Sequence, residues 1–70
     1  MYQKYLNAVQ DERMKRPRWR TGQCYFNVLF AFFPEIADSV RGGPLDPFHR
    51  DAVIPSFLKF IEEELNKKAN

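Results

Sequence analysis

The sequence predicts a single, small all-α domain over residues 1–70. Apolar residues recur at helical spacing in several segments, and prolines and a pair of glycines separate those segments. Strict alternation of apolar and polar residues does not occur, and neither do the Asn-Gly or Asp-Gly pairs typical of hairpin turns. A chain of 70 residues forms one domain at most, so the predicted helices must share one core.

The first helix is predicted over residues 2–16. Its apolar side chains follow the helical repeat and share one face: Tyr2, Tyr5, Leu6 and Val9. Asp11 and Glu12 each precede a cation by four residues, a spacing that stabilises a helix by about 0.2–0.5 kcal/mol per pair. Pro17 disfavours a helical conformation at the residue before it, so we expect the helix to end there.

The second helix is predicted over residues 21–33, with Thr21 as its N-cap. On a helical wheel, five of its apolar side chains share one broad face: Tyr25, Phe26, Leu29, Phe32 and Phe33. The opposite side is a narrow seam of polar or small residues, namely Gln23, Asn27 and Ala31. A helix that is apolar over most of its circumference is normally buried, so we expect this one to form the centre of the core.

A short third helix is predicted over residues 34–41. Pro34 suits the first position of a helix, because the N–H that proline lacks would have no partner there. The sequence Gly42-Gly43-Pro44 then ends the helix. In the connection that follows, Asp46-Pro47 has the pattern of a cap and a first helical residue, so we expect a single helical turn near residues 47–50.

The last helix is predicted over residues 55–67, because Pro55 tolerates only the first turn of a helix. Its apolar residues fall on one face: Phe57, Leu58, Ile61 and Leu65. The remaining faces carry most of the acidic and basic residues of this segment. We therefore expect an amphipathic helix that packs one side against the second helix and leaves the other in water.

Few residues could carry catalysis or bind a metal. Cys24 and His49 are the only cysteine and histidine, too few for a four-ligand zinc site. Cys24 lies among apolar residues, where a thiol keeps a high pKa and is unreactive. The three consecutive acids at 62–64 point about 100° apart on a helix and cannot converge on one ion. We therefore expect a protein that is not an enzyme and holds neither a metal nor a cofactor.

The sequence indicates neither a membrane span nor a signal peptide. Its most apolar segment, residues 24–33, is far shorter than the ~20 residues that a spanning helix needs. The N-terminal residues are polar and amphipathic, without the apolar region of a signal peptide. A single cysteine suits a reducing compartment, so we expect the protein to act in the cytoplasm.

The strongest indication of function is a basic cluster next to this apolar segment. Residues 13–20 read Arg-Met-Lys-Arg-Pro-Arg-Trp-Arg, with five cations and a tryptophan in eight positions. Trp and Arg are enriched in the hot spots of protein interfaces, and a long connection such as 42–54 is often functional. We therefore expect a protein partner, with these contact residues: Arg16, Arg18, Trp19, Arg20, Phe48 and His49.

A second hypothesis assigns the same cluster to nucleic acid. The cations of Arg13–Arg20 would contact phosphates, and Trp19 would stack on a base. No base-reading motif accompanies them, and the last helix is acidic, so a protein partner is favoured. The sequence leaves open whether the protein associates with itself.

One combination of residues is distinctive: Trp19-Arg20-x-Gly22-Gln23-x-x-Phe26-Asn27-x-Leu29, then Pro34, Ala37-Asp38, Arg41-Gly42 and Asp46-Pro47-Phe48. In these residues the chain resembles a loose group of short, uncharacterised proteins encoded by bacteriophages and some bacteria. The resemblance covers about residues 19–60 and brings no active-site residues with it. It implies a phage-type accessory protein that binds and modulates host machinery in the bacterial cytoplasm.

Overall fold

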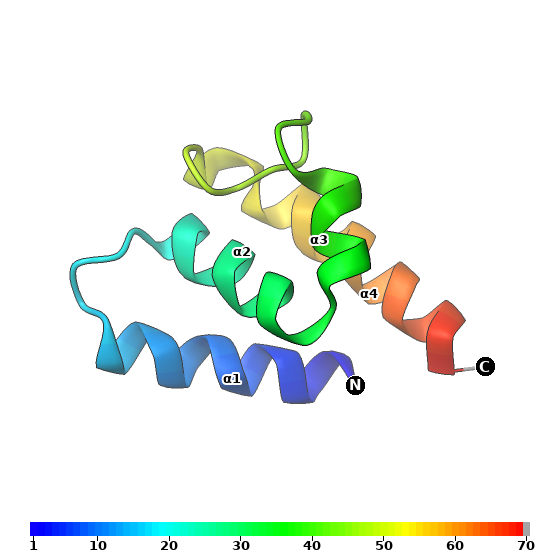
Figure 1. The fold of residues 1–70 in the computed structure, drawn as a ribbon, viewed down its shortest axis with the longest axis horizontal. Helices are drawn as coiled ribbons and strands as arrows, with labels where there is room; N and C mark the ends of the chain where they lie inside the picture. The colour runs from blue at the N-terminus through cyan, green and yellow to red at the C-terminus, as the bar shows by residue number, and fades with distance from the viewer. Residues whose placement is uncertain (70) are drawn as a thin grey trace.

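The computed structural model describes residues 1–69, and it describes the side chains of residues 1–67. These residues form four α-helices and one short 3₁₀ helix, and they contain no β-strand (Figure 1). In chain order the elements are α1 (Tyr2–Lys15), α2 (Thr21–Phe32), α3 (Pro34–Val40), η1 (Asp51–Val53) and α4 (Ile54–Ala69). The all-α fold predicted from the sequence is therefore confirmed.

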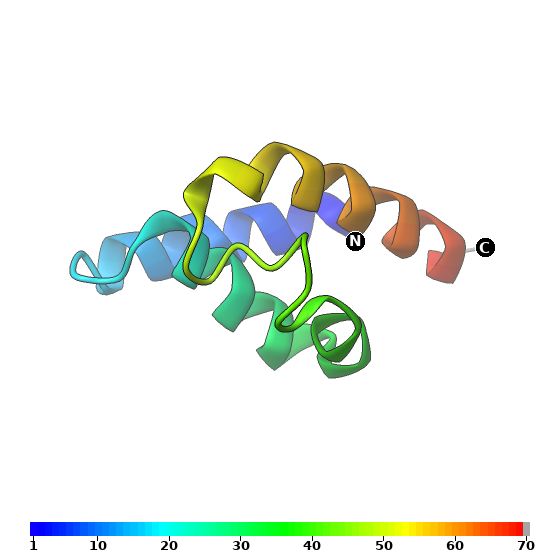
Figure 2. The same cartoon turned by 90° about the horizontal axis from the view of Figure 1, so that it is seen from above.

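The helices are arranged around α2. Helices α1 and α2 lie side by side and run in roughly opposite directions (Figure 1). Helix α3 turns back on α2 at Phe33, and α4 packs across α1 and the core side of α2 (Figure 2). The link between α1 and α2 lies at the end of the molecule away from the N-terminus, in both views.

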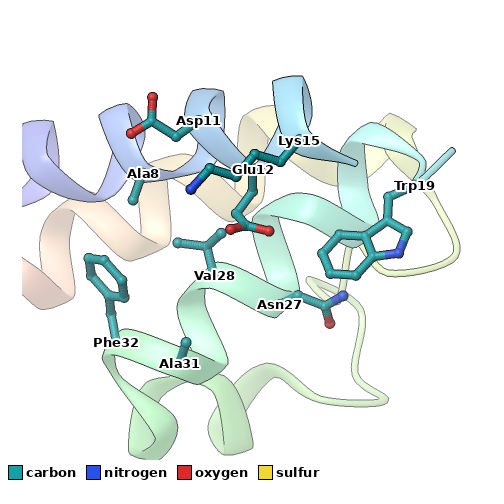
Figure 3. A pocket seen from close by; sticks show the side chains of 9 residues that line it. All are labelled: Ala8, Asp11, Glu12, Lys15, Trp19, Asn27, Val28, Ala31 and Phe32. Carbon is teal, nitrogen blue, oxygen red and sulfur yellow. The ribbon is translucent and has the colours of Figure 1, made fainter. Parts of the chain in front are cut away.

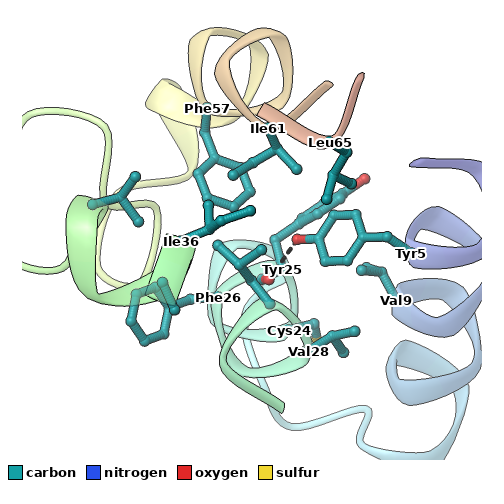
Figure 4. Packing of buried hydrophobic residues seen from close by; sticks show 13 residues of the cluster. Tyr5, Val9, Cys24, Tyr25, Phe26, Val28, Ile36, Phe57, Ile61 and Leu65 are labelled. Carbon is teal, nitrogen blue, oxygen red and sulfur yellow. Dashed lines mark hydrogen bonds between the residues drawn. The ribbon is translucent and has the colours of Figure 1, made fainter. Parts of the chain in front are cut away.

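The core draws on all four α-helices (Figure 4). Tyr25 of α2 contacts aromatic side chains of both α1 and α4. Its ring lies 6.4 Å from the ring of Tyr5 in α1 and 6.3 Å from the ring of Phe57 in α4. The Tyr5 hydroxyl donates a buried hydrogen bond of 2.6 Å to the Tyr25 carbonyl oxygen. Burial, followed by the neighbouring Tyr25, raises the pKa of Tyr5 well above its usual value, so the hydroxyl keeps its proton.

The second helix is less buried than its sequence suggests. The expectation that Phe32 points into the core is wrong, because its side chain is 51% exposed. Cys24 and Val28 are buried in its place, on the side that faces α1. The cause is the position of α1: Phe32 and the α1 residues Ala8 and Asp11 border an open groove instead of closing on one another.

Two boundary predictions also differ in detail. Arg20, and not Thr21, is the N-cap of α2, and its side chain makes no capping hydrogen bond. The single helical turn predicted near residues 47–50 lies instead at Asp51–Val53. At 47–50 the Arg50 N–H donates to the Pro47 carbonyl over 3.2 Å, which closes one turn that does not continue as a helix. Proline at 47 fixes the backbone, but tertiary contacts decide where the helix begins.

Asp46 holds the connection between α3 and η1 in shape. Its carboxylate accepts hydrogen bonds from the Phe48 N–H at 2.9 Å and from the Gly42 N–H at 2.7 Å. Gly42 has a positive φ of 73°, the left-handed conformation that glycine adopts without strain and that commonly ends a helix. The connection is thereby folded back over the beginning of α2.

Gly22 allows this close approach. A Cβ atom at Gly22 would lie 1.9 Å from the Pro47 carbonyl oxygen and 2.8 Å from the Asp51 Oδ1. With glycine there, the Gly22 N–H donates to Asp51 Oδ1 over 2.9 Å. The first turn of a helix has N–H groups without intrahelical partners, so Asp51 caps α2 from 29 residues away. This contact anchors the connection beside the link between α1 and α2.

Candidate partner-binding surface

A groove lies between α1 and α2 on the surface (Figure 3). Its volume is about 370 Å³, enough for several apolar side chains. Helix α1 supplies one wall with Ala8, Asp11, Glu12 and Lys15, and α2 supplies the other with Asn27, Val28, Ala31 and Phe32. Trp19, in the link between these helices, closes one end, and Phe32 lies at the other.

Trp19 is held in place by the residues just before it. Its side chain is half-buried, and the backbone N–H of Trp19 donates to the Arg16 carbonyl oxygen over 3.1 Å. The Arg16 guanidinium lies 4.9 Å from the centre of the indole ring, a cation–π distance. The same guanidinium pairs with the Glu12 carboxylate at 3.4 Å, and Figure 3 shows that carboxylate pointing into the groove. Arg16 and Trp19, both expected contact residues, are therefore brought together.

Arg20, Phe48 and His49 meet on the other side of the link. The Arg20 guanidinium donates to the Phe48 carbonyl oxygen and lies 3.5 Å from the His49 Nδ1. Arg20 thus fastens the α3–η1 connection to the start of α2, in addition to the contact between Gly22 and Asp51. The structure brings these three expected contact residues into one cluster, although Phe48 and His49 follow Arg20 by 28 and 29 residues in the chain.

The six expected contact residues differ in how much surface they offer. Phe48 packs edge-on against Phe26, with ring centres 5.9 Å apart, and is half-buried as an anchor of its connection. His49 is exposed and lies against the Phe48 ring. Arg18 is exposed too, and it borders a shallow hollow that Trp19 also lines. Of the six, Phe48 is the residue that is held in position by packing against the core residue Phe26.

Sequence reasoning did not assign Val28, Ala31 and Phe32 to a binding surface. The available signal was the composition of α2, which carries more apolar side chains than one core face can hold. Phe30 is a further exposed aromatic on α2, at 46%, and does not line the groove. The Arg41 guanidinium lies 5.0 Å from its ring centre, so a cation covers part of this ring.

The two residues considered for catalysis lie in different environments. Cys24 is fully buried, and burial raises the pKa of its thiol. His49 is exposed in the connection before η1. Across the described residues, no group of three or more His, Cys, Asp or Glu side chains is arranged to hold a metal ion. No helix in that part of the chain is both long enough and apolar enough to cross a membrane.

No protein-family model, no curated protein and no solved structure matches this chain. Function is therefore inferred from what the surface itself offers. The groove presents apolar side chains in its floor and carboxylates on one wall, and Trp19 joins it to the arginines of the link. Such an arrangement can accept the apolar side of another polypeptide and pair with charges at its edge.

Proposed function

We propose that this protein is a non-enzymatic binding protein that docks on a protein partner through the groove between α1 and α2. The observation that carries the proposal is the groove itself, a hollow of about 370 Å³ with Trp19 at one end and the half-exposed Phe32 at the other. Interface cores are enriched in aromatic residues, and Trp is among the commonest hot spots. Exposure of such apolar surface to water is unfavourable in free energy, and a bound partner would remove that surface from water.

The proposal includes the setting that the sequence resemblance implies. The motif that begins at Trp19-Arg20 and ends at Asp46-Pro47-Phe48 resembles short phage-encoded proteins. On this proposal the chain is a phage-type accessory protein that modulates host machinery in the bacterial cytoplasm.

Capture from a bacterial lysate tests the proposal. Tagged protein, after nuclease treatment of the lysate, should retain a discrete protein identified by mass spectrometry. Trp19→Ala should weaken this capture by about 2 kcal/mol or more, the size of a hot-spot loss. Phe30→Ala is the matched control, because it removes an exposed aromatic ring outside the groove. Circular dichroism checks that both variants fold. Equal capture by wild type and a folded Trp19→Ala variant would reject the proposal.

Nucleic-acid binding through Arg13–Arg20 is the second candidate. It is favoured by the exposure of Arg13, Lys15 and Arg18, whose cations are free to approach phosphates. It is weakened by the cation–π contact of Arg16, which covers part of the indole that a base would stack on. For about three phosphate contacts to duplex DNA, the logarithm of affinity should fall with the logarithm of salt at a slope of about −2.7. A complex that stays tight at about 0.15 M salt would favour this candidate over a protein partner.

A further inference from the structure

The fold joins a basic segment to a second segment that is distant in the sequence and carries one arginine. Residues 12–20, at the end of α1 and in the link after it, are held to residues 46–51, before and at η1, by Arg20 and by the cap of Asp51 on Gly22. Together they hold six cations, all of them exposed: Arg13, Lys15, Arg16, Arg18, Arg20 and Arg50. We call this cluster the basic end. Arg50 belongs to it because the fold brings residues 46–51 to the link, although 30 residues separate Arg50 from Arg20 in the chain.

Each of the three carboxylates within the basic end already has a partner. Glu12 pairs with Arg16, Asp46 accepts two backbone N–H groups, and Asp51 caps α2. Among the described residues, no carboxylate pairs with Arg18 or Arg50. Six cations against three carboxylates leave a net positive charge that exceeds the +2 of the whole chain. The remainder of the molecule is therefore slightly acidic, and the positive field is confined to this end.

The groove meets the basic end at Trp19. This residue lines both the groove and the hollow beside Arg18. At its opposite end the groove is lined by Ala31 and Phe32 of α2. A ligand that follows the groove therefore meets apolar surface first and, beyond Trp19, a group of arginines. A ligand with one apolar end and one charged end therefore fits in only one orientation, with its charged end toward the arginines.

We propose, on the basis of the docking function above, that the groove binds an amphipathic helix of the partner whose end beyond Trp19 is rich in Asp and Glu. A third helix can lie in the groove between two helices that are side by side. The apolar side chains at every third or fourth residue of the bound helix then enter the groove as anchors. The acidic end pairs with Arg18 and Arg50, and this pairing fixes the direction of the bound helix and speeds its encounter.

A nucleic acid fits this surface less well than an acidic helix. Asp11 and Glu12 line the groove and would repel phosphates that enter it. An acidic peptide avoids that repulsion, because its carboxylates lie beyond Trp19 and only its apolar side chains enter the groove. The indole, partly covered by Arg16, suits an edge contact with an aliphatic side chain better than a stacked base.

Selection from a display library of random, helix-forming peptides tests the inference. Peptides that bind wild type should carry apolar residues at helical spacing and a cluster of Asp and Glu at one end. Ala31→Arg should abolish their binding by filling the groove, whereas Asn66→Arg, the same added charge at an exposed site on α4, should not. The double variant Arg18→Glu/Arg50→Glu should lower the association rate constant about tenfold or more at low salt. Its control is Lys59→Glu/Lys67→Glu, two exposed cations on α4.

Each alternative outcome has a distinct reading. In one outcome, the selected peptides lose binding to Ala31→Arg but carry no cluster of Asp and Glu, and they bind the double variant as well as wild type. This result overturns the inference about charge and leaves the proposed docking function standing. Failure to select any peptide sensitive to Ala31→Arg removes the groove itself, and with it the proposed function. Tight duplex DNA binding at about 0.15 M salt, lost in the double variant, assigns the basic end to nucleic acid. A dimer of wild type that Ala31→Arg dissociates makes a second copy the occupant.

Discussion

The middle and the last turn of α2 both carry apolar side chains but have opposite environments. In the covered part, residues 24–29, Tyr25 and Leu29 are buried in the core shared with the other helices. In the open part, residues 30–32, Ala31 and Phe32 remain at the surface and line the groove, although Phe32 lies on the same helical face as Tyr25. Hydrophobicity is a property of the side chain, but burial requires a neighbouring element to cover it. A chain of 70 residues has too few helices to surround α2, so part of its apolar surface is left for contact with another molecule.

The largest difference should appear when a large side chain is shortened in each part of α2. Leu29→Ala removes a fully buried side chain and should lower the free energy of unfolding by about 2–5 kcal/mol. Phe32→Ala should cost below about 1 kcal/mol, because half of that ring is already in water. Chemical denaturation measured by circular dichroism gives both values. Equal losses for the two variants would contradict the division of α2 into a covered part and an open part.

The next effect concerns the start of α2, where the connection before η1 covers the helix. Gly22→Ala places a Cβ where the Pro47 carbonyl oxygen now lies, so we expect a loss of about 1–3 kcal/mol from overpacking. Gly43→Ala is the control, because its Cβ would lie 3.4 Å from its nearest neighbour, the Val40 carbonyl oxygen. Its effect should stay within about 0.5 kcal/mol. If the two glycines prove equally tolerant, the close contact at Gly22 does not hold the connection in place.

The contact between α1 and the covered part of α2 should contribute less. Tyr5→Phe keeps the ring and removes the hydrogen bond to the Tyr25 carbonyl, at a cost of about 0.5–1.5 kcal/mol near neutral pH. Tyr25→Phe is the matched control, because it removes a hydroxyl and leaves this hydrogen bond, which uses the Tyr25 backbone, in place. Urea titration of the three proteins compares them.

Alkaline pH sharpens this prediction. The folded state keeps the Tyr5 proton above pH 10 because burial raises its pKa, whereas the unfolded state loses it near 10. Above that pH the unfolded state binds fewer protons, so the free energy of unfolding falls by up to about 1.4 kcal/mol per pH unit from this group. Tyr5→Phe lacks this dependence, and its deficit relative to wild type should vanish within about one pH unit above 10. A deficit that is constant up to pH 11 would show that Tyr5 is not buried as a protonated hydroxyl.

The last comparison measures the rate at which a cysteine in α2 reacts with a thiol reagent, and it involves little change in the free energy of unfolding. Cys24, in the covered part of α2, should react slowly with a thiol reagent in the folded protein, since it is buried and burial raises its pKa. Ala31→Cys in a Cys24→Ala background puts the thiol about two turns further along the same helix, in its open part, where it should react at the rate of an exposed cysteine. Fast labelling of native wild type at neutral pH would instead reopen the question of a reactive Cys24.

The sequence alone determined the helices and the sites where they end. Helical periodicity in α1 and α4, Pro34 at the start of α3 and Gly42 at its end are local signals, and each acts through the backbone of its own segment. The basic cluster at 13–20, with Trp19 in it, was also visible from residue order. These features need no knowledge of what the chain folds against.

Only the tertiary structure decided which apolar side chains of α2 are covered, and which distant residues meet. Wheel geometry groups Phe32 with Tyr25, but the position of α1 leaves Phe32 at the edge of a groove. Asp51 caps α2, and Arg50 joins the basic end, because Gly22 lets the connection approach closely. Such contacts depend on the relative placement of helices, which packing of the whole core fixes and no local pattern encodes.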